Sequence, residues 1–562
     1  MKLHYVAILA SLLSAGPAYT KTTPKPTPCA GNTPSHRSIW CDYSISTDYE
    51  SVVPNTGVTR EYWFNVEEVT LAPDGFSRPV MTVNGTLPGP TIFANWGDWL
   101  IIHVTNNLGQ AKNGSSIHWH GIRQNYTNPN DGVPSITQCP IAPGSSMIYK
   151  WRATQYGSTW YHSHIGLQAW EGVYGGVIIN GPASANYDVD KGVLFLSDWT
   201  HRTVDELYLT QQQLGPVNNL TNGLINGTNV YESGSSATGS RFTMKVNSGT
   251  SYRLRLVNPS IDTHWKFSID NHTLTVISTD LVPIKPYKTN VLSIGMGQRY
   301  DVIVTANQAK IAQSFWMRAI PATACSGNDN ADNIRGIVYY GTKSTIPQTT
   351  GHFSPSDCND EALTNLVPYV PKNVDPPVWN NNTDVSVFIN PERLFRWEFN
   401  ATSLNVSWEN PTLGKIYNHE KNFTNTSGVI ELPFKNKWVY LLINTTFEVT
   451  HPIHLHGHDF SILAQGNGIW NGSMITQNPP RRDTAMLPPS GWLLLAWKTD
   501  NPGAWLMHCH IGWHVNEGLA LQFIERYDEI RGLIDYKPFE QVCNKWDAYD
   551  ASADIVQADS GV

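Results

Sequence analysis

The stretch "WLMHCHIGWH", residues 505 to 514, sets three histidines around one cysteine. Side chains of a β-strand alternate between its two faces. In an extended strand, His508 and His510 would therefore point to one side and Cys509 to the other. Such a strand could hold one metal on the cysteine side and two metals on the histidine side.

Histidine pairs of this kind recur along the chain. Random placement of 19 histidines in 562 residues predicts fewer than one His-x-His pair. The chain has five, at 118/120, 162/164, 454/456, 456/458 and 508/510. Neutral imidazole is the commonest protein ligand for transition metals, so the set indicates metal binding rather than ordinary core histidines.

The pairs belong to a longer internal repeat. "SSIHWHGI" (115–122) matches "HPIHLHGH" (451–458), and "GSTWYHSHIGLQ" (157–168) matches "GAWLMHCHIGWH" (503–514). The first and last thirds of the chain are therefore predicted to be copies of one β-domain. The 43 glycines, the 36 prolines and an aromatic content of 11% also favour a β-rich, turn-rich protein.

The two copies differ at three positions that matter chemically. Ser115, Ser163 and Gln168 in the first copy stand where the second copy has two histidines and a cysteine. Two histidines and one cysteine are the ligands of a blue-copper site. The last third is therefore predicted to keep such a site, with the ligands His451, Cys509 and His514.

Both copies keep four further histidines. Across an interface between the two domains, these eight imidazoles are enough for a cluster of three metals. They are His118, His120, His162, His164, His454, His456, His508 and His510.

The length and the patterning predict several domains in tandem. Residues 190–345 contain β-like runs but no His-x-His pair, so this part is expected to have the same fold without metal. The predicted boundaries are 1–20 for a signal peptide, 21–49 for an N-terminal segment, 50–185, 190–345 and 381–562 for three domains, and 346–380 for a polar, Pro-rich linker.

The N-terminus indicates secretion. Lys2, an apolar run from Leu3 to Leu13 and small residues near Ala18 form a secretory signal, because the run is too short to span a membrane. A net charge of −8 gives no footprint for nucleic acid or anionic membrane. Thirteen glycosylation sequons fit a secreted glycoprotein: Asn84, Asn113, Asn125, Asn219, Asn226, Asn271, Asn381, Asn400, Asn405, Asn422, Asn425, Asn444 and Asn471.

Seven cysteines leave one without a partner in an oxidising compartment. The odd one is assigned to Cys509 because of its histidine neighbours. The remaining six allow fifteen pairings, and the sequence alone does not choose among them. Short loops suggest Cys29–Cys41 and Cys325–Cys358, which leaves Cys139–Cys543 to tie the two ends of the chain together.

The complete set of motifs resembles the four copper motifs of the multicopper oxidases, in order through the whole mature chain. Within that family the chain most resembles the fungal, ascomycete-type laccases, and its final "DSGV" (559–562) is similar to their C-terminal plug. The motifs are His118-Trp-His120-Gly, His162-Ser-His164, His451-Pro-Ile-His454-Leu-His456 and His508-Cys-His510-Ile-Gly-Trp-His514.

This resemblance implies an all-β fold of three cupredoxin-like Greek-key barrel or sandwich domains in tandem. It also implies four copper ions, with His451, Cys509 and His514 on the type 1 copper. The type 2 copper would take His118 and His454. One type 3 copper would take His120, His162 and His510, and the other His164, His456 and His508.

The resemblance further implies roles for residues that hold no metal. Leu519 would occupy the axial position of the type 1 site without coordinating, which raises the potential. Asp131 would relay protons near the cluster, although an Asp-Gly turn alone would explain it. Asp262 would accept the proton of a phenol as general base. Aromatic residues of the substrate pocket would be Phe395, Trp397 and Trp513, beside His514.

The resulting hypothesis is a secreted, monomeric laccase that oxidises phenols or aromatic amines one electron at a time and reduces O₂ to water. Cys509, with His508 and His510, would carry the electrons. Ascorbate oxidase and ferroxidase remain alternatives. Only nine methionines argue against a cuprous oxidase, which would need thioether ligands. A copper carrier without turnover would have no need for the linked Cys-His geometry.

Overall fold

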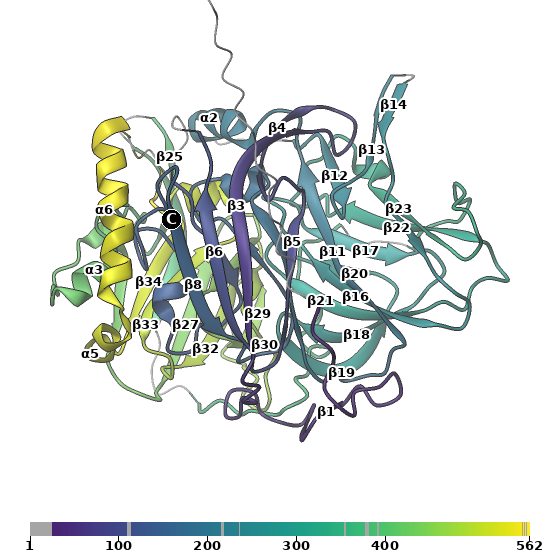
Figure 1. The fold of residues 1–562 in the computed structure, drawn as a ribbon, viewed down its shortest axis with the longest axis horizontal. Coiled ribbons are helices and arrows are strands. Elements are labelled where there is room, and N and C mark those ends of the chain that lie inside the picture. Colours follow the sequence, from purple (N-terminus) through teal and green to yellow (C-terminus); the bar gives the residue numbers. More distant parts are fainter. Residues whose placement is uncertain are drawn as a thin grey trace, which may run out of the picture.

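A computed structural model describes residues 25–109, 114–214, 219–234, 236–352, 356–376, 381–390, 393–553, 555, 557 and 559–562. The predicted signal peptide and the sequon at Asn113 lie outside these residues. The described strands form three pairs of sheets that follow one another along the chain (Figure 1). Among the described helices, none is both long enough and apolar enough to cross a membrane.

The first pair, here called domain 1, has four strands in each sheet, in the orders β4-β3-β6-β8 and β5-β10-β9-β7. Its strands are β3 (Thr59–Leu71), β4 (Arg78–Val83), β5 (Gly89–Asn95), β6 (Trp99–Asn106), β7 (His118–His120), β8 (Ser146–Arg152), β9 (Gly157–His162) and β10 (Tyr174–Asn180). A short hairpin of β1 (Ile39–Trp40) and β2 (Tyr43–Ser44) precedes them.

Domain 2 has sheets in the orders β12-β11-β16-β21-β18-β19 and β15-β23-β22-β17-β20. Its strands are β11 (Val189–Trp199), β12 (Asn222–Ile225), β15 (Thr243–Lys245), β16 (Ser251–Val257), β17 (Trp265–Ile269), β18 (Leu274–Thr279), β19 (Val282–Thr289), β20 (Leu292–Ile294), β21 (Arg299–Thr305), β22 (Ser314–Pro321) and β23 (Arg335–Tyr339). The hairpin of β13 (Val230–Ser233) and β14 (Ser236–Gly239) projects from this domain (Figure 1).

Domain 3 has sheets in the orders β25-β24-β27-β32-β29-β30 and β26-β34-β33-β28-β31. Its strands are β24 (Asn381–Ile389), β25 (Phe395–Phe399), β26 (Val429–Leu432), β27 (Trp438–Thr445), β28 (His451–Leu455), β29 (Phe460–Asn467), β30 (Arg481–Arg482), β31 (Thr484–Leu487), β32 (Gly491–Lys498), β33 (Gly503–Cys509) and β34 (Ala520–Glu525).

The strands form because apolar residues alternate with polar ones on half-covered sheets. In β6, Leu100, Ile102 and Val104 are fully buried, while the residues between them are partly exposed. Strands between the domains, such as β33, are buried along their whole length. Each pair of sheets encloses its own apolar cluster, so the mostly-β expectation with three domains is confirmed.

The repeat of the sequence is also a repeat of strand register. In domain 1, His118 on β7 pairs with His162 on β9. In domain 3, His454 on β28 pairs with His508 on β33. These are the positions that the two sequence copies align, so equivalent histidines stand opposite each other in both domains.

Helices connect and cover the sheets. They are α1 (Gln168–Glu171), α2 (Val204–Leu214), α3 (Thr412–Tyr417), α4 (Gly512–Asn516), α5 (Tyr527–Ile530) and α6 (Tyr536–Ala553), with 3₁₀ turns η1 (Asn128–Asn130), η2 (Ala331–Asn333), η3 (Asn425–Ser427) and η4 (Arg531–Leu533). Helix α6 was not predicted from the sequence, and it stands along the side of the molecule beside domain 3 (Figure 1).

Three disulfides join Cys29 to Cys41, Cys325 to Cys358, and Cys139 to Cys543. The first two are the pairs that short loops suggested, and the third is the pair that remained. Cys509 is free and buried. The Cys139–Cys543 bond fixes α6 to domain 1, and Trp546 of α6 is fully buried against Trp408.

The predicted linker has no helix or strand among its described residues, yet it is packed rather than loose. Leu366 is fully buried, and Val374 and Cys358 are nearly so. The side chain of Asp360 bonds to Gln298 of domain 2 and, with its other oxygen, to Gln465 of domain 3. The segment therefore packs against both domain 2 and domain 3 at their junction.

Candidate metal centres

The first centre surrounds the Cys509 thiol at the end of β33. The Cys509 Sγ atom lies 3.8 Å from His451 Nδ1 and 3.6 Å from His514 Nδ1. The two imidazole nitrogens are 3.2 Å apart. The strand β28 supplies His451 and the short helix α4 supplies His514. Two nitrogens and one sulfur thus converge on a single point, as a blue-copper site requires.

Burial sets the protonation states at this centre. Burial lowers the pKa of His451 to about 3, and burial followed by the neighbouring His451 lowers the pKa of His514 well below its usual value. Both rings are therefore neutral and can donate lone pairs to a metal. Burial raises the pKa of the Cys509 thiol, so a bound metal must stabilise the thiolate.

Leu519 belongs to the same buried cluster as Cys509 and is itself fully buried. Its carbonyl oxygen accepts a hydrogen bond from the Cys509 backbone N–H at 3.0 Å, and its N–H donates to the His514 carbonyl at 2.9 Å. An aliphatic side chain next to the cysteine offers no donor atom to a metal. Its role as a non-coordinating axial residue stays a prediction.

The second centre lies between domains 1 and 3, where the eight paired histidines meet. Their rings form a continuous set of contacts, including a stacked pair from His118 and His456 at 4.0 Å and another from His120 and His454 at 3.9 Å. One expected ligand set, His164 with His456 and His508, has its donor atoms within 4.8 Å of one another. The other close groups at this centre share residues: His118 with His454 and His456, His118 with His120 and His162, and His120 with His454 and Asp483.

The expected set of His120, His162 and His510 is less compact. The His510 ring centre lies 5.0 Å from that of His120 and 5.6 Å from that of His162. His510 belongs to none of the close donor groups found among the described residues. Its two ring nitrogens are nevertheless buried without a hydrogen-bond partner.

The donor atoms of this centre fit metal ions. Five rings bond to an oxygen through Nδ1, which therefore carries the proton, and each has a buried Nε2 without a partner. These are His118, His162, His454, His456 and His508. Orphaned neutral nitrogens in a buried interior are costly unless a metal binds them, and histidine metal ligands commonly donate their second N–H in this way.

Asp131 links the two halves of the cluster. Its carboxylate oxygen Oδ2 lies 2.8 Å from His456 Nδ1 of domain 3, and its backbone carbonyl lies 2.8 Å from His118 Nδ1 of domain 1. Asp131 is fully buried after the turn η1. The predicted position beside the cluster is thus observed, and its direct effect is to orient two rings.

A cavity of about 440 Å³ opens beside the first centre. Its walls include Asp262, Trp397, Trp513 and His514, with Phe395 among the lining residues. The Trp397 ring packs 4.2 Å from that of His514. All of the residues expected in a substrate pocket therefore line one space next to the first centre.

Asp198, which was not predicted from the sequence, holds the backbone around Asp262 in place. The Asp198 carboxylate accepts the backbone N–H groups of Ile261 and Asp262 at 3.0 and 3.1 Å and the Thr263 hydroxyl at 2.9 Å. Burial and then the charge of Asp198 raise the pKa of Asp262 well above its usual value. No spacing signal marked Asp198, because it acts from a different strand.

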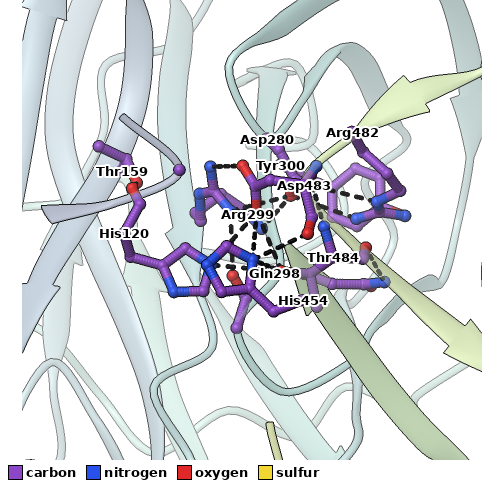
Figure 2. A network of polar contacts seen from close by, with 12 residues as sticks. His120, Thr159, Asp280, Gln298, Arg299, Tyr300, His454, Arg482, Asp483 and Thr484 are labelled. Carbon is purple, nitrogen blue, oxygen red and sulfur yellow. Dashed lines mark hydrogen bonds and ion pairs between the residues drawn. The ribbon is translucent and has the colours of Figure 1, made fainter. Parts of the chain in front are cut away.

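Asp483 was also missed. It lies between β30 and β31 and is fully buried beside His120 and His454 (Figure 2). By contrast, His458 bonds to Glu525 through Nε2 at 3.0 Å. Two histidines outside the His-x-His pairs, His103 and His201, pair with Glu61 and Asp74.

Comparisons with known proteins agree with this geometry. The multicopper oxidase family matches residues 65–184, 190–342 and 397–529. The chain is 48% identical over 552 residues to Laccase-2 of Botryotinia fuckeliana, covering 95% of this chain and 94% of that protein.

Solved structures give the same result. The crystal structure of laccase from Botrytis aclada superposes with a TM-score of 0.91 at 47% identity, over 95% of this chain and all of that chain. Fet3p, a multicopper oxidase that functions in iron import, gives a TM-score of 0.77 at 28% identity, over 89% of this chain and 96% of that one. From its sequence, its sheets and its buried histidine and cysteine centres, the chain belongs to the multicopper oxidases and is a laccase, a copper-dependent oxidoreductase.

Proposed function

We propose that this laccase oxidises phenols and aromatic amines in the cavity beside His514 and reduces O₂ at the histidine cluster between domains 1 and 3. The observation that carries the proposal is the strand end at Cys509. One side of β33 presents the thiol to the cavity-side centre, and its neighbours His508 and His510 belong to the cluster.

Four copper ions would be held by these residues. The type 1 ion would take His451, Cys509 and His514, and the type 2 ion His118 and His454. The type 3 ions would take His120, His162 and His510, and His164, His456 and His508. Bound copper supplies one-electron transfer at the first site and a multi-metal site for the four-electron reduction of oxygen at the second. The buried ring nitrogens without a hydrogen-bond partner support the assignment of the cluster histidines as ligands.

The chain supplies the path between the sites. The Cys509 sulfur, which would hold the type 1 copper, is separated from His508 and His510 only by the covalent bonds of adjacent residues, and these bonds would carry the electron to the cluster. Four phenol molecules each lose one electron and one proton, and one O₂ becomes two water molecules. Because electrons are collected from the phenol at one centre and O₂ is reduced at the other, partly reduced oxygen stays away from the substrate.

We assign proton transfer to one carboxylate at the cavity and another at the histidine cluster. At the cavity, an ionised Asp262 oxygen would accept the phenolic proton as the electron leaves, which is general-base catalysis. The hydrogen bonds from residues 261–263 to Asp198 hold this carboxyl in place. At the cluster, Asp131 would relay protons to oxygen, because it lies against the expected ligands His118 and His456.

We infer that the protein is secreted and that residues 1–20 are removed. The three disulfides, which persist in oxidising compartments, support secretion. So do sequons at exposed asparagines, for example Asn125, Asn405 and Asn471. Mass spectrometry of the secreted protein, before and after glycan removal, would give the mature N-terminus and the occupied sites.

Oxygen uptake by the copper-loaded protein tests the substrate assignment. A methoxyphenol, ascorbate and Fe(II) are offered in separate runs at equal concentration. We expect rapid uptake with the methoxyphenol and little with the other two. Preference for ascorbate or Fe(II) would contradict the proposed use of the cavity, and loss of uptake in Cys509→Ser is the control for the electron path.

A further inference from the structure

Domain 2 has none of the expected copper ligands, yet one of its arginines reaches the histidine cluster through an ion pair. Arg299 of β21 donates from Nη1 to Asp483 Oδ1 at 2.6 Å and from Nη2 to Asp483 Oδ2 at 2.5 Å. Both side chains are fully buried. The same Oδ1 atom lies 3.2 Å from His120 Nε2, so one carboxylate joins domains 1, 2 and 3 (Figure 2).

A second carboxylate fixes both partners of this pair. Asp280 Oδ1 accepts the Arg299 backbone N–H at 3.0 Å, and Asp280 Oδ2 accepts the Asp483 backbone N–H at 3.1 Å. Arg482 donates to Asp280 from Nε at 3.1 Å and from Nη2 at 3.2 Å. Neither Arg299 nor Asp483 can therefore turn without breaking buried, charge-assisted hydrogen bonds.

This arrangement selects one form of the His120 ring. A carboxylate beside Nε2 favours the proton there, and Thr484 Oγ1 lies 3.3 Å from the same nitrogen. Nδ1 of His120 is buried without a partner. The ring thus offers Nδ1 to the cluster, whereas His118, His162, His454, His456 and His508 offer Nε2.

His454 is held by the same element. Its Nδ1 lies 2.8 Å from the Asp483 carbonyl oxygen and 3.1 Å from Thr484 Oγ1. The Thr484 hydroxyl donates to Asp483 Oδ1 at 2.9 Å. Two expected ligands, one from domain 1 and one from domain 3, are therefore oriented by residues 483 and 484.

Two glycines allow this close approach. A Cβ atom at Gly121, where φ is +74°, would overlap Arg299 Nη2 and Asp483 Oδ2. A Cβ at Gly297 of domain 2, where φ is +81°, would lie 2.9 Å from the His510 ring and 3.1 Å from that of His120. The backbone of domain 2 is thus in direct contact with the cluster.

We propose that Arg299 and Asp483 are positioning residues through which the copper-free domain 2 fixes the protonated nitrogen and the orientation of His120. The inference rests on the proposed function, because it takes His120 and His454 to be copper ligands. It gives domain 2 a part in the oxygen site rather than only in separating its neighbours.

The test compares copper retention in Asp483→Asn and in the parent. Asparagine keeps the shape of the side chain but no longer pairs with the Arg299 fork, and its amide can turn a donor toward His120. Loss of a residue that orients a metal ligand weakens metal binding by about 10- to 100-fold. We expect the type 2 and type 3 copper to be lost to a chelator at correspondingly lower concentration, with an altered type 2 EPR signal. The blue absorption of the type 1 site should remain.

A matched control removes a similar ion pair elsewhere in domain 2. Arg318 bonds to Asp270 at 2.7 and 2.9 Å, and this buried carboxylate has no described contact with a cluster histidine. Asp270→Asn should keep the cluster copper. Arg299→Lys keeps the positive charge but not the two-pronged guanidinium, and it should lose an intermediate amount of cluster copper. It is the variant to use if Asp483→Asn fails to fold.

The outcomes separate the two ideas. If both Asp483→Asn and Arg299→Lys retain copper and EPR signals like Asp270→Asn, the positioning role is wrong. Equal loss of the type 1 and cluster signals in these variants would also overturn it, because that would be a general effect on stability. A parent protein that binds no cluster copper would overturn the ligand assignment itself.

Discussion

At the scale of single residues, the general-base role proposed for Asp262 makes a prediction about how the rate depends on pH. Burial and Asp198 raise its pKa, and a carboxyl accepts a proton only when ionised. We therefore expect kcat/KM for a phenol to rise as the pH increases through the pKa of Asp262. Asp262→Asn should abolish this rise and lower kcat/KM by about 100-fold, the scale of general-base catalysis.

Steady-state kinetics across pH would check this prediction. Ferrocyanide, which loses an electron without a proton, is the control substrate and should be oxidised equally by both proteins. An Asn variant that keeps the parent pH profile with phenols would show that another group takes the proton.

Leu519 allows a second prediction at this scale. A leucine offers no axial ligand, whereas the thioether of methionine can coordinate weakly and stabilise the oxidised copper. Leu519→Met should lower the potential of the type 1 copper, measured by redox titration of the blue absorption. Leu521→Met, in the adjoining strand β34 and equally apolar, is the matched control, and a shift of the same size there would rule out an axial effect.

Which residues could be predicted follows from their spacing. His508, Cys509 and His514 are marked because their neighbours in sequence are also their neighbours in space. Asp483 is a single acid with no paired spacing, and its main partner, Arg299, comes from a domain without metal ligands. Such contacts depend on how three domains dock, which a pattern within one strand does not contain.

At the scale of elements, the strands that hold ligands were predictable and the last helix was missed. Alternation in β33 sends His508 and Cys509 to different centres, and the histidines that the repeat aligns occupy equivalent positions in the pairings of β7 with β9 and of β28 with β33. For α6 a signal was present. Val542, Trp546 and Tyr549 are its buried residues, and their spacing is that of one helical face.

The C-terminal segment is the element whose change should affect oxygen reduction. Val562 is 2% exposed, and the Ser135 hydroxyl donates to the Gly561 carbonyl at 2.7 Å. Ser560 bonds through its backbone to Val406 and Asn516. If this packed segment plugs a channel to the cluster, residues appended after Val562 would fill more of that channel, so we expect slower oxygen reduction.

Two rates measured separately would locate the effect of such an extension. Anaerobic bleaching of the blue colour by a phenol reports on the first centre and should be unchanged. Reoxidation by O₂ should slow. Replacing Val562 with alanine, without added length, is the control, and equal reoxidation rates in all three proteins would contradict a plug.

At the scale of the whole molecule, the oxygen site exists only where domains 1 and 3 meet, so whatever holds them together supports catalysis. The Cys139–Cys543 bond links domain 1 to α6 across 404 residues, whereas Cys29–Cys41 spans only 12. In the chain-entropy model, a cross-link stabilises more when it closes a longer loop, and these two loops differ by about 3 kcal/mol. Cys139→Ser/Cys543→Ser should therefore lower the melting temperature more than Cys29→Ser/Cys41→Ser in calorimetry of the copper-loaded proteins.

The first variant should also lose cluster copper on heating before it loses the blue colour, because the cluster spans the interface and the type 1 site lies within domain 3. If the two variants melt alike and lose both signals together, the long disulfide does not hold the interface, and packing between the domains alone would account for its stability.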